Sequence, residues 1–122
     1  MIVFNRINHV QICIPPGAEN DARRFYTDLM GLQEIPKPPS LIANGGLWYK
    51  IADVELHIGV EPVVAKSKRH PAFEVTDLTF ARELLEKNNI QINEEPYIEG
   101  RIRFSFIDPF GNRIELLQII ET

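Results

Sequence analysis

The chain has 122 residues, of which 44% are hydrophobic and 25% charged, with a formal net charge of −4. This length and composition predict one compact domain. The acidic balance argues against a nucleic-acid or anionic-membrane partner, although a local arginine can still bind a small anionic substrate. One cysteine, Cys13, excludes an internal disulfide. The start of the chain lacks a signal-peptide pattern and no apolar run is long enough to cross a membrane, so we expect a soluble cytoplasmic protein.

The first half of the chain predicts one helix among four strands. Apolar and polar residues alternate in "RINHVQICI", which indicates a strand that "PPG" then ends. Helical spacing of the apolar residues follows, up to a stop at Gly31. Prolines and paired glycines predict an irregular loop over 36–46. In all, we expect strands over 6–14, 32–35, 47–51 and 54–60, and a helix over 18–30.

The second half repeats this order after a connector. Its helix should begin at Asp77 or Thr79, either of which can cap it. We expect its apolar residues Phe80, Ala81, Leu84 and Leu85 to face the core. The turn "DPFGN" joins the last two strands. The predicted elements are strands over 69–75, 90–92, 101–107 and 113–120, a helix over 78–88 and a loop over 94–100.

The chain therefore reads β-α-β-β-β twice, which predicts an α+β fold of two paired βαβββ modules. Module one covers about 1–61 and module two about 68–122, within a single domain. Neither module is large enough to bury much surface alone, whereas two together are. We expect a cupped, barrel-like mixed sheet with the helices outside and a cleft on the inner faces.

Residues that can bind a metal recur at nearly one period. His9 and His70 open the first strand of each module, at an offset of 61 (70 − 9). Glu55 in "VEL" and Glu115 in "IEL" have an offset of 60 (115 − 55). Strand alternation sends these four residues and His57 toward the cleft. Imidazoles and carboxylates together suit Zn, Ni, Co, Mn or Fe(II).

Other residues leave alternatives open. Glu55 is the favoured fourth ligand, because His57 is the counterpart of an ordinary residue, Leu117; His57 is then a substitute ligand or a polar group of the pocket. Either carboxylate of the set can move a proton. Arg103 could bind a substrate carboxylate or phosphate, or be a solvated arginine. Arg113 could be a partner of Glu115. A strand histidine is often only structural, and a strand glutamate often faces solvent.

The sequence resembles the vicinal oxygen chelate superfamily, which includes glyoxalase I, extradiol dioxygenases, and fosfomycin- and bleomycin-resistance proteins. The resemblance rests on "INHVQICI", "ARRFYTDLMGL", "VELHIGVEP", "RHPAFEV" and "FSFIDPFGNRIELLQ". It implies the paired βαβββ fold and a metal on His9, His70 and Glu115, which Glu55 joins in glyoxalase-like members. It also implies a homodimer, because several members form the site between modules of two subunits. His57, two residues after Glu55, departs from the usual single polar ligand on that strand.

Three functions follow as hypotheses. The first is a divalent-metal-dependent lyase or isomerase of glyoxalase type, which acts on a small oxygen-rich substrate. The second is a non-haem Fe(II) dioxygenase of catechol-like substrates, although the chain is short for an extradiol dioxygenase. The third is a metal-independent small-molecule binding or resistance protein.

Overall fold

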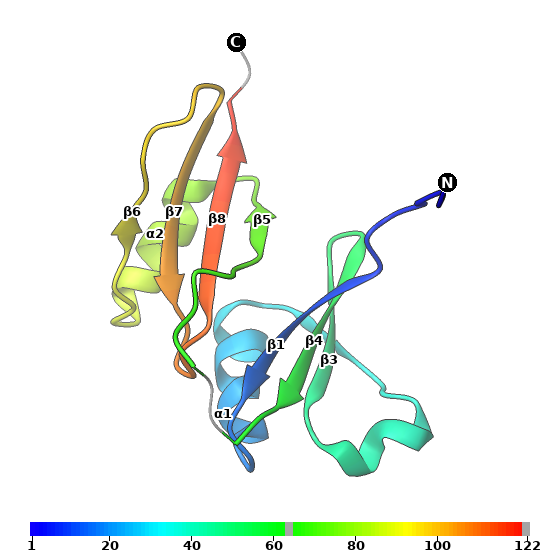
Figure 1. The fold of residues 1–122 in the computed structure, drawn as a ribbon. Helices are drawn as coiled ribbons and strands as arrows, with labels where there is room; N and C mark the ends of the chain where they lie inside the picture. Colours follow the sequence, from blue (N-terminus) through cyan, green and yellow to red (C-terminus); the bar gives the residue numbers. More distant parts are fainter. Residues whose placement is uncertain (63–64, 121–122) are drawn as a thin grey trace. The chain divides into compact units, whose positions relative to one another are not determined.

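The computed structural model describes residues 1–62 and 65–120, which belong to two compact units, Met1–Val64 and Ala65–Thr122. Each unit contains one open, four-stranded mixed sheet with helical segments (Figure 1). The predicted α+β fold class, with its two β-α-β-β-β units, is confirmed. No helix in the described part of the chain is both long and apolar enough to span a membrane.

The first sheet has the strand order β1-β4-β3-β2. Its two central strands form the predicted hairpin, and β1 lies parallel to β4. β1 begins at His9 and is thus shorter at its start than the predicted strand. The strands are β1 (His9–Ile14), β2 (Gln33–Ile35), β3 (Leu47–Ile51) and β4 (Val54–Val60).

One face of this sheet packs against the first helix. α1 (Glu19–Arg23) continues into the π-helical segment η1 (Arg24–Leu29) and ends before Gly31, whose φ is +78°. The helix buries Phe25 and Tyr26, and the hydroxyl of Thr27 lies 2.8 Å from that of Tyr49 on β3. The predicted loop over 36–46 is only partly irregular, because it contains the 3₁₀ helix η2 (Pro39–Asn44).

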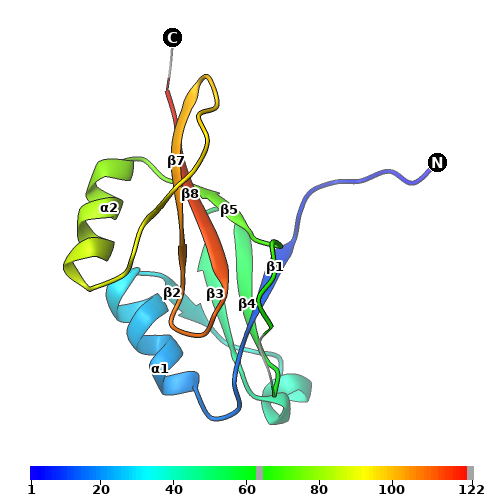
Figure 2. The ribbon, with the colours of Figure 1, turned by 60° about the vertical axis from the view of Figure 1, so that its left-hand side comes forward.

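The second sheet repeats the topology, with the order β5-β8-β7-β6 and β5 parallel to β8. α2 (Leu78–Lys87) packs on one face, near β7 and β8 in both views (Figures 1 and 2). The predicted cap is present, since the Asp77 side chain accepts from the Phe80 N–H. The strands are β5 (Ala72–Glu74), β6 (Asn93–Glu94), β7 (Arg101–Ile107) and β8 (Arg113–Ile119).

Two expectations for the second unit are wrong. The strand expected over 90–92 lies at Asn93–Glu94, where it pairs with β7. Phe80 does not face the core: it is 62% exposed. The buried residues of α2 are Leu78 and Leu85, seven positions apart, and Phe80 lies off this stripe.

The register shows how the two units correspond. His9 lies opposite Glu55 in the first unit, whereas Ala72 lies opposite Glu115 in the second. The structural counterpart of His9 is therefore Ala72, and His70 lies two residues earlier in the chain. With the two glutamates taken as counterparts, as the sequence repeat predicts, the two histidines are out of register by two residues.

Candidate functional site

In the first unit, the sheet face opposite α1 carries the polar side chains. The register places His9 and Glu55 in one row, and Gln11, His57 and Trp48 in the next. These residues line a pocket of about 600 Å³. Further polar residues of its wall are Asn8, Lys37 and Asn44. The predicted clustering of His9, Glu55 and His57 on one face is present.

Three aromatic rings form a stack at this pocket. His57 lies between Trp48 and His9, with ring-centre distances of 3.8 Å and 3.9 Å and interplanar angles of 5° and 16°. The stack buries the imidazole of His57, which is 6% exposed. Its Nε2 atom lies 2.8 Å from Oε1 of Glu55. His57 therefore holds the candidate ligand Glu55, which lies two residues earlier on the same strand.

The ring of His9 is oriented by its neighbour in the chain. Its Nδ1 lies 2.9 Å from the side-chain oxygen of Asn8, an amide oxygen that only accepts hydrogen bonds. Nδ1 is thus the donor in this contact, and Nε2 is the ring nitrogen that remains for another partner. Metal-binding histidines commonly donate their other ring N–H in this way.

In the second unit, His70 shows the same arrangement. Its Nδ1 lies 2.8 Å from the backbone oxygen of Lys68, which can only accept a hydrogen bond. Its Nε2 lies 3.3 Å from Oε1 of Glu115. Either an N–H on this ring nitrogen or a metal ion between the two atoms makes this contact favourable.

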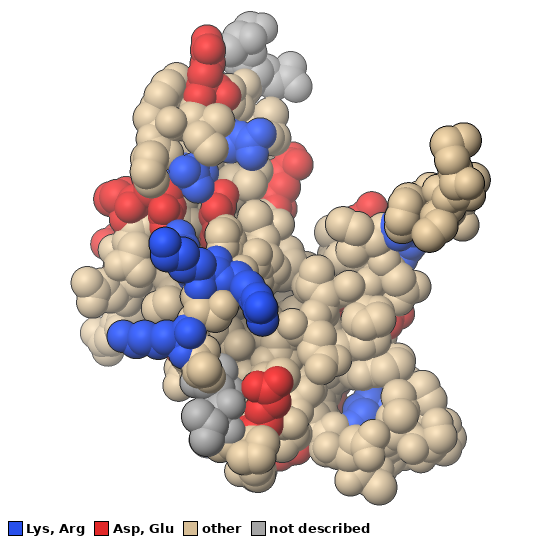
Figure 3. Space-filling model, viewed as in Figure 1, with Lys and Arg blue, Asp and Glu red and all other residues tan. Residues whose placement is uncertain are grey.

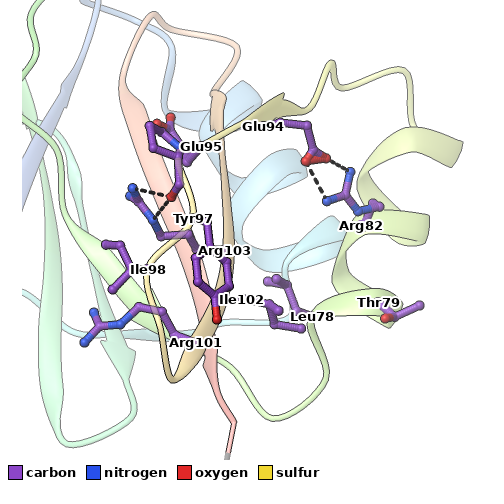
Figure 4. Close-up of a pocket in the computed structure, with 11 residues that line it drawn as sticks. Leu78, Thr79, Arg82, Glu94, Glu95, Tyr97, Ile98, Arg101, Ile102 and Arg103 are labelled. Atoms are coloured by element: carbon purple, nitrogen blue, oxygen red, sulfur yellow. Dashed lines mark hydrogen bonds and ion pairs between the residues drawn. The ribbon is translucent and has the colours of Figure 1, made fainter.

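Arg103 is the other partner of Glu115. Its Nη1 donates to Oε1 of Glu115 over 3.1 Å, and both side chains are largely buried. Its Nε and Nη2 donate to the backbone oxygen of Pro96 at 3.2 Å and 2.9 Å (Figure 4). Each nitrogen of the guanidinium thus has a partner inside the unit. The role of Arg103 in substrate binding stays a prediction.

The expected pairing of Arg113 with Glu115 is wrong. Arg113 donates instead to Oε1 of Glu95 over 2.9 Å, and the hydroxyl of Ser105 donates to the same oxygen over 2.6 Å. These contacts lower the pKa of Glu95, the hydrogen bond from Ser105 being the larger cause. Glu95 is therefore a structural anion that ties the loop before β7 to the sheet.

A second pocket, of about 300 Å³, lies at the edge of β7 beside α2. Arg101 and Arg103 project from β7 to the side away from α2, whereas Ile102 projects toward Leu78 (Figure 4). Acidic and basic side chains are mixed on the exposed sheet face around β7 and β8 (Figure 3). The Nε of Arg101 is buried and has no hydrogen-bond partner among the described residues.

The sequence interpretation missed several contacts. The stacking of Trp48 on His57 is one of them, although the two-residue turn of the predicted hairpin already places these residues opposite each other. Asn8 was not singled out, although it directly precedes His9. No sequence signal indicates the contact between Lys68 and His70, since a backbone oxygen accepts in it.

The four candidate ligands divide between the units, His9 and Glu55 in one and His70 and Glu115 in the other. Within residues 1–62 and 65–120, no group of three or more His, Cys, Asp or Glu side chains is assembled to hold a metal ion. Each pair nevertheless has donors of the right chemistry, since both histidines are fixed through Nδ1. The complete ligand set stays a prediction.

The structure resembles several solved proteins. A glyoxalase family protein from Bacillus anthracis is 40% identical, with a TM-score of 0.91 over 98% of this chain and 99% of the other. Lactoylglutathione lyase from Agrobacterium tumefaciens is 18% identical, with a TM-score of 0.71 over 93% and 92% of the two chains. The fosfomycin resistance protein FosX from Listeria monocytogenes is 15% identical, with a TM-score of 0.75 over 97% and 96%. These last two likenesses show the fold alone.

No curated protein sequence gives a significant match. Residues 6–116 match the model of the Glyoxalase/Bleomycin resistance protein/Dioxygenase superfamily. The match includes all of the candidate ligands. Together with the 40% identity to the Bacillus anthracis protein, it shows that the chain belongs to this superfamily.

Proposed function

We propose that the protein is a divalent-metal-dependent enzyme of glyoxalase type, a lyase or isomerase that acts on a small oxygen-rich substrate. His9, Glu55, His70 and Glu115 would hold the metal, which is one of Zn, Ni, Co, Mn or Fe(II). Membership of the superfamily supports the class of protein. The likeness to lactoylglutathione lyase supports the fold that this chemistry uses.

The contact between His70 and Glu115 is the observation that carries this proposal. The Nδ1 of His70 lies 2.8 Å from the backbone oxygen of Lys68, and its Nε2 faces Oε1 of Glu115 across 3.3 Å. A purely structural histidine–glutamate pair needs a second proton on the ring. A metal ion satisfies both groups without that proton, and a ligating carboxylate is commonly held by a further donor, as Arg103 does here.

The chemistry of the site follows from its donors. A bound divalent ion polarises substrate oxygens and stabilises an oxyanion. Glu55, whose side chain is 38% exposed, faces a pocket that a substrate can enter and would ligate the ion or accept a proton. Glu115 has a largely buried side chain, which suits an anchoring ligand with a secondary role in proton transfer. Lys37, Gln11 and Asn44 offer polar contacts to a substrate in the same pocket.

Metal analysis of chelator-free protein tests the proposal. We expect a fixed ratio of ion to chain, with a loss of affinity in His9→Ala and in Glu115→Gln, and little metal in the double variant. Undiminished affinity and stoichiometric metal in the double variant would overturn the ligand set. Substrate screening of metal-loaded protein then tests the activity.

We also propose a homodimer, as the resemblance to the vicinal oxygen chelate superfamily implies. A cytoplasmic location is part of the same proposal and rests on the lone cysteine. Sedimentation of the metal-loaded protein checks the subunit number, and a monomer that retains the metal stoichiometry argues against the dimer.

A dioxygenase is the second candidate, because two histidines and one carboxylate also suit non-haem Fe(II). It requires oxygen uptake with a catechol-like substrate and only with iron. A protein that binds small molecules equally well with and without chelator, and that turns none of them over, would instead be a binding or resistance protein.

A further inference from the structure

His57 contacts both candidate ligands of the first unit. One face of its ring stacks on His9, and its Nε2 lies 2.8 Å from Oε1 of Glu55. The other face stacks on Trp48. The imidazole is thus fixed from both faces and at its Nε2, and through it the two candidate ligands are held relative to each other.

Packing alone does not explain a histidine at this position. A ring that is 6% exposed between two others is poorly solvated, and its polar N–H costs free energy unless it is paired. An apolar residue would fill the same space without that requirement. The second unit has such a residue, because Leu117 follows Glu115 by two residues, as His57 follows Glu55. The imidazole therefore provides something beyond volume, namely the hydrogen bond to Glu55.

In the second unit, the side chain that holds the glutamate is an arginine, Arg103. Leu117 lies opposite Arg103, just as His57 lies opposite Trp48. Arg103 donates to Oε1 of Glu115. Each glutamate is therefore held through Oε1 by an N–H donor from its own sheet, and in the described part of the chain neither Oε2 atom accepts a hydrogen bond.

We propose that His57 is a positioning residue that holds Glu55 through Oε1, so that the other carboxylate oxygen of Glu55 would be free to ligate the metal ion. This inference rests on the proposed function, because it assumes that Glu55 is a ligand. In this role His57 acts on the ion through Glu55, and the double variant described below distinguishes that role from ligation through its other ring nitrogen, Nδ1. This role explains why β4 carries two polar residues, Glu55 and His57, although one of them is enough to bind the ion.

A matched pair of variants in the full-length chain tests the role of His57, with Co²⁺ as the probe. Methionine and glutamine have similar length, but only glutamine keeps an N–H donor. We expect His57→Met to weaken Co²⁺ binding by about 10–100-fold and to change the visible absorption spectrum of the bound ion. His57→Gln should restore much of the affinity and the spectrum.

A double variant separates positioning from ligation. If His57 acts through Glu55, His57→Met should cause no further loss of affinity once Glu55→Gln is present. An equal loss in both backgrounds would show that His57 ligates the ion or only maintains the structure, and would overturn the inference. Unchanged Co²⁺ affinity in His57→Met would also overturn it.

The proposed function fails in a different way. If the unmodified protein binds no Co²⁺, or if His9→Ala and Glu115→Gln do not weaken binding, then the metal site itself is wrong. If His57→Met does not fold, Glu55→Gln and His57→Gln still decide the case. Glu55→Gln must weaken binding if Glu55 is a ligand, and His57→Gln must keep affinity closer to that of the unmodified protein than to that of Glu55→Gln. The reverse order overturns the inference.

Discussion

Arg103 and Glu115 form an ion pair between two largely buried side chains, which are 15% and 8% exposed. Removal of the arginine leaves a buried carboxylate without its strongest partner. We therefore expect Arg103→Met to lower the free energy of unfolding by about 3 kcal/mol. Urea denaturation of the metal-free protein, followed by circular dichroism, measures this change.

Arg101 is a matched control for Arg103. It lies on the same face of β7, two residues earlier, and forms no ion pair among the described residues. Its buried Nε has no hydrogen-bond partner there either. Arg101→Met should change the stability by less than about 0.5 kcal/mol. An equal loss in both variants would show that the stem of the arginine, rather than its ion pair, stabilises the sheet.

Trp48 is a built-in reporter of metal binding, since it is the only tryptophan of the chain. It stacks on His57, which stacks on the candidate ligand His9. We expect Co²⁺ to quench the fluorescence of Trp48 in a saturable way. An ion bound to His9 would be separated from the indole of Trp48 by the stacked rings of His9 and His57. Zn²⁺, which has a filled d shell, should quench much less.

The control for this titration is His9→Ala, which removes the ligand and leaves Trp48 and His57 in place. Its fluorescence should respond to Co²⁺ only at much higher concentrations. Quenching with the same midpoint in this variant would place the ion elsewhere in the protein.

The sequence predicted the fold well because strand alternation and turn residues are local signals. Both hairpins, the cap at Asp77 and the shared face of Glu55 and His57 are present. The two-residue offset of the histidines was missed, because register depends on how β5 pairs with β8 and not on the spacing within either strand.

The partners of the candidate ligands were harder to predict. Arg113 precedes Glu115 by two residues and was an attractive partner on the same strand face, but the bond comes from Arg103 on the neighbouring strand. Long arginine side chains reach across strands. Which carboxylate Arg113 binds therefore depends on the position of the loop that carries Glu95. The conformation of such a loop is set by tertiary contacts and leaves no periodic signal in the sequence.

Glu95 predicts a pH dependence of stability. Its pKa is lowered in the folded protein, first by the hydrogen bond from Ser105 and then by Arg113. A lowered pKa stabilises the fold above the pKa of the unfolded carboxyl, about 4.3, and this stabilisation is lost as the pH falls through the folded-state value. Glu95→Gln should therefore cost about 1–2 kcal/mol at pH 7 and progressively less below about pH 4.3.

Urea midpoints measured between pH 7 and pH 3 check this prediction. Glu99→Gln is a suitable control for the change of charge, because Glu99 is exposed and forms no ion pair among residues that the structure describes. A cost of Glu95→Gln that stays constant down to pH 3 would mean that the carboxylate charge does not contribute.

Gly46 is held in a conformation that other residues cannot adopt without a clash. Its φ is +85°, and a Cβ atom there would lie 2.1 Å from the backbone oxygen of Ile58 on β4. Gly31 has a similar φ of +78°, but a Cβ atom there meets nothing within 4 Å. Gly31→Ala should therefore cost only the backbone strain, about 1–2 kcal/mol. Gly46→Ala should cost about 3–5 kcal/mol, because β3 must also move away from β4.

The Gly46 variant should also perturb the pocket of the first unit. The N–H of Gly46 donates to Oε2 of Glu19, and the strand that begins next carries Trp48. A shift of β3 would separate Trp48 from His57 and change the tryptophan emission, whereas Gly31→Ala should leave that emission as it is. Equal urea midpoints for the two variants would show that the sheet accommodates the extra methyl group at little cost. The close approach of Gly46 to Ile58 would then not be what fixes the register of Trp48 against His57.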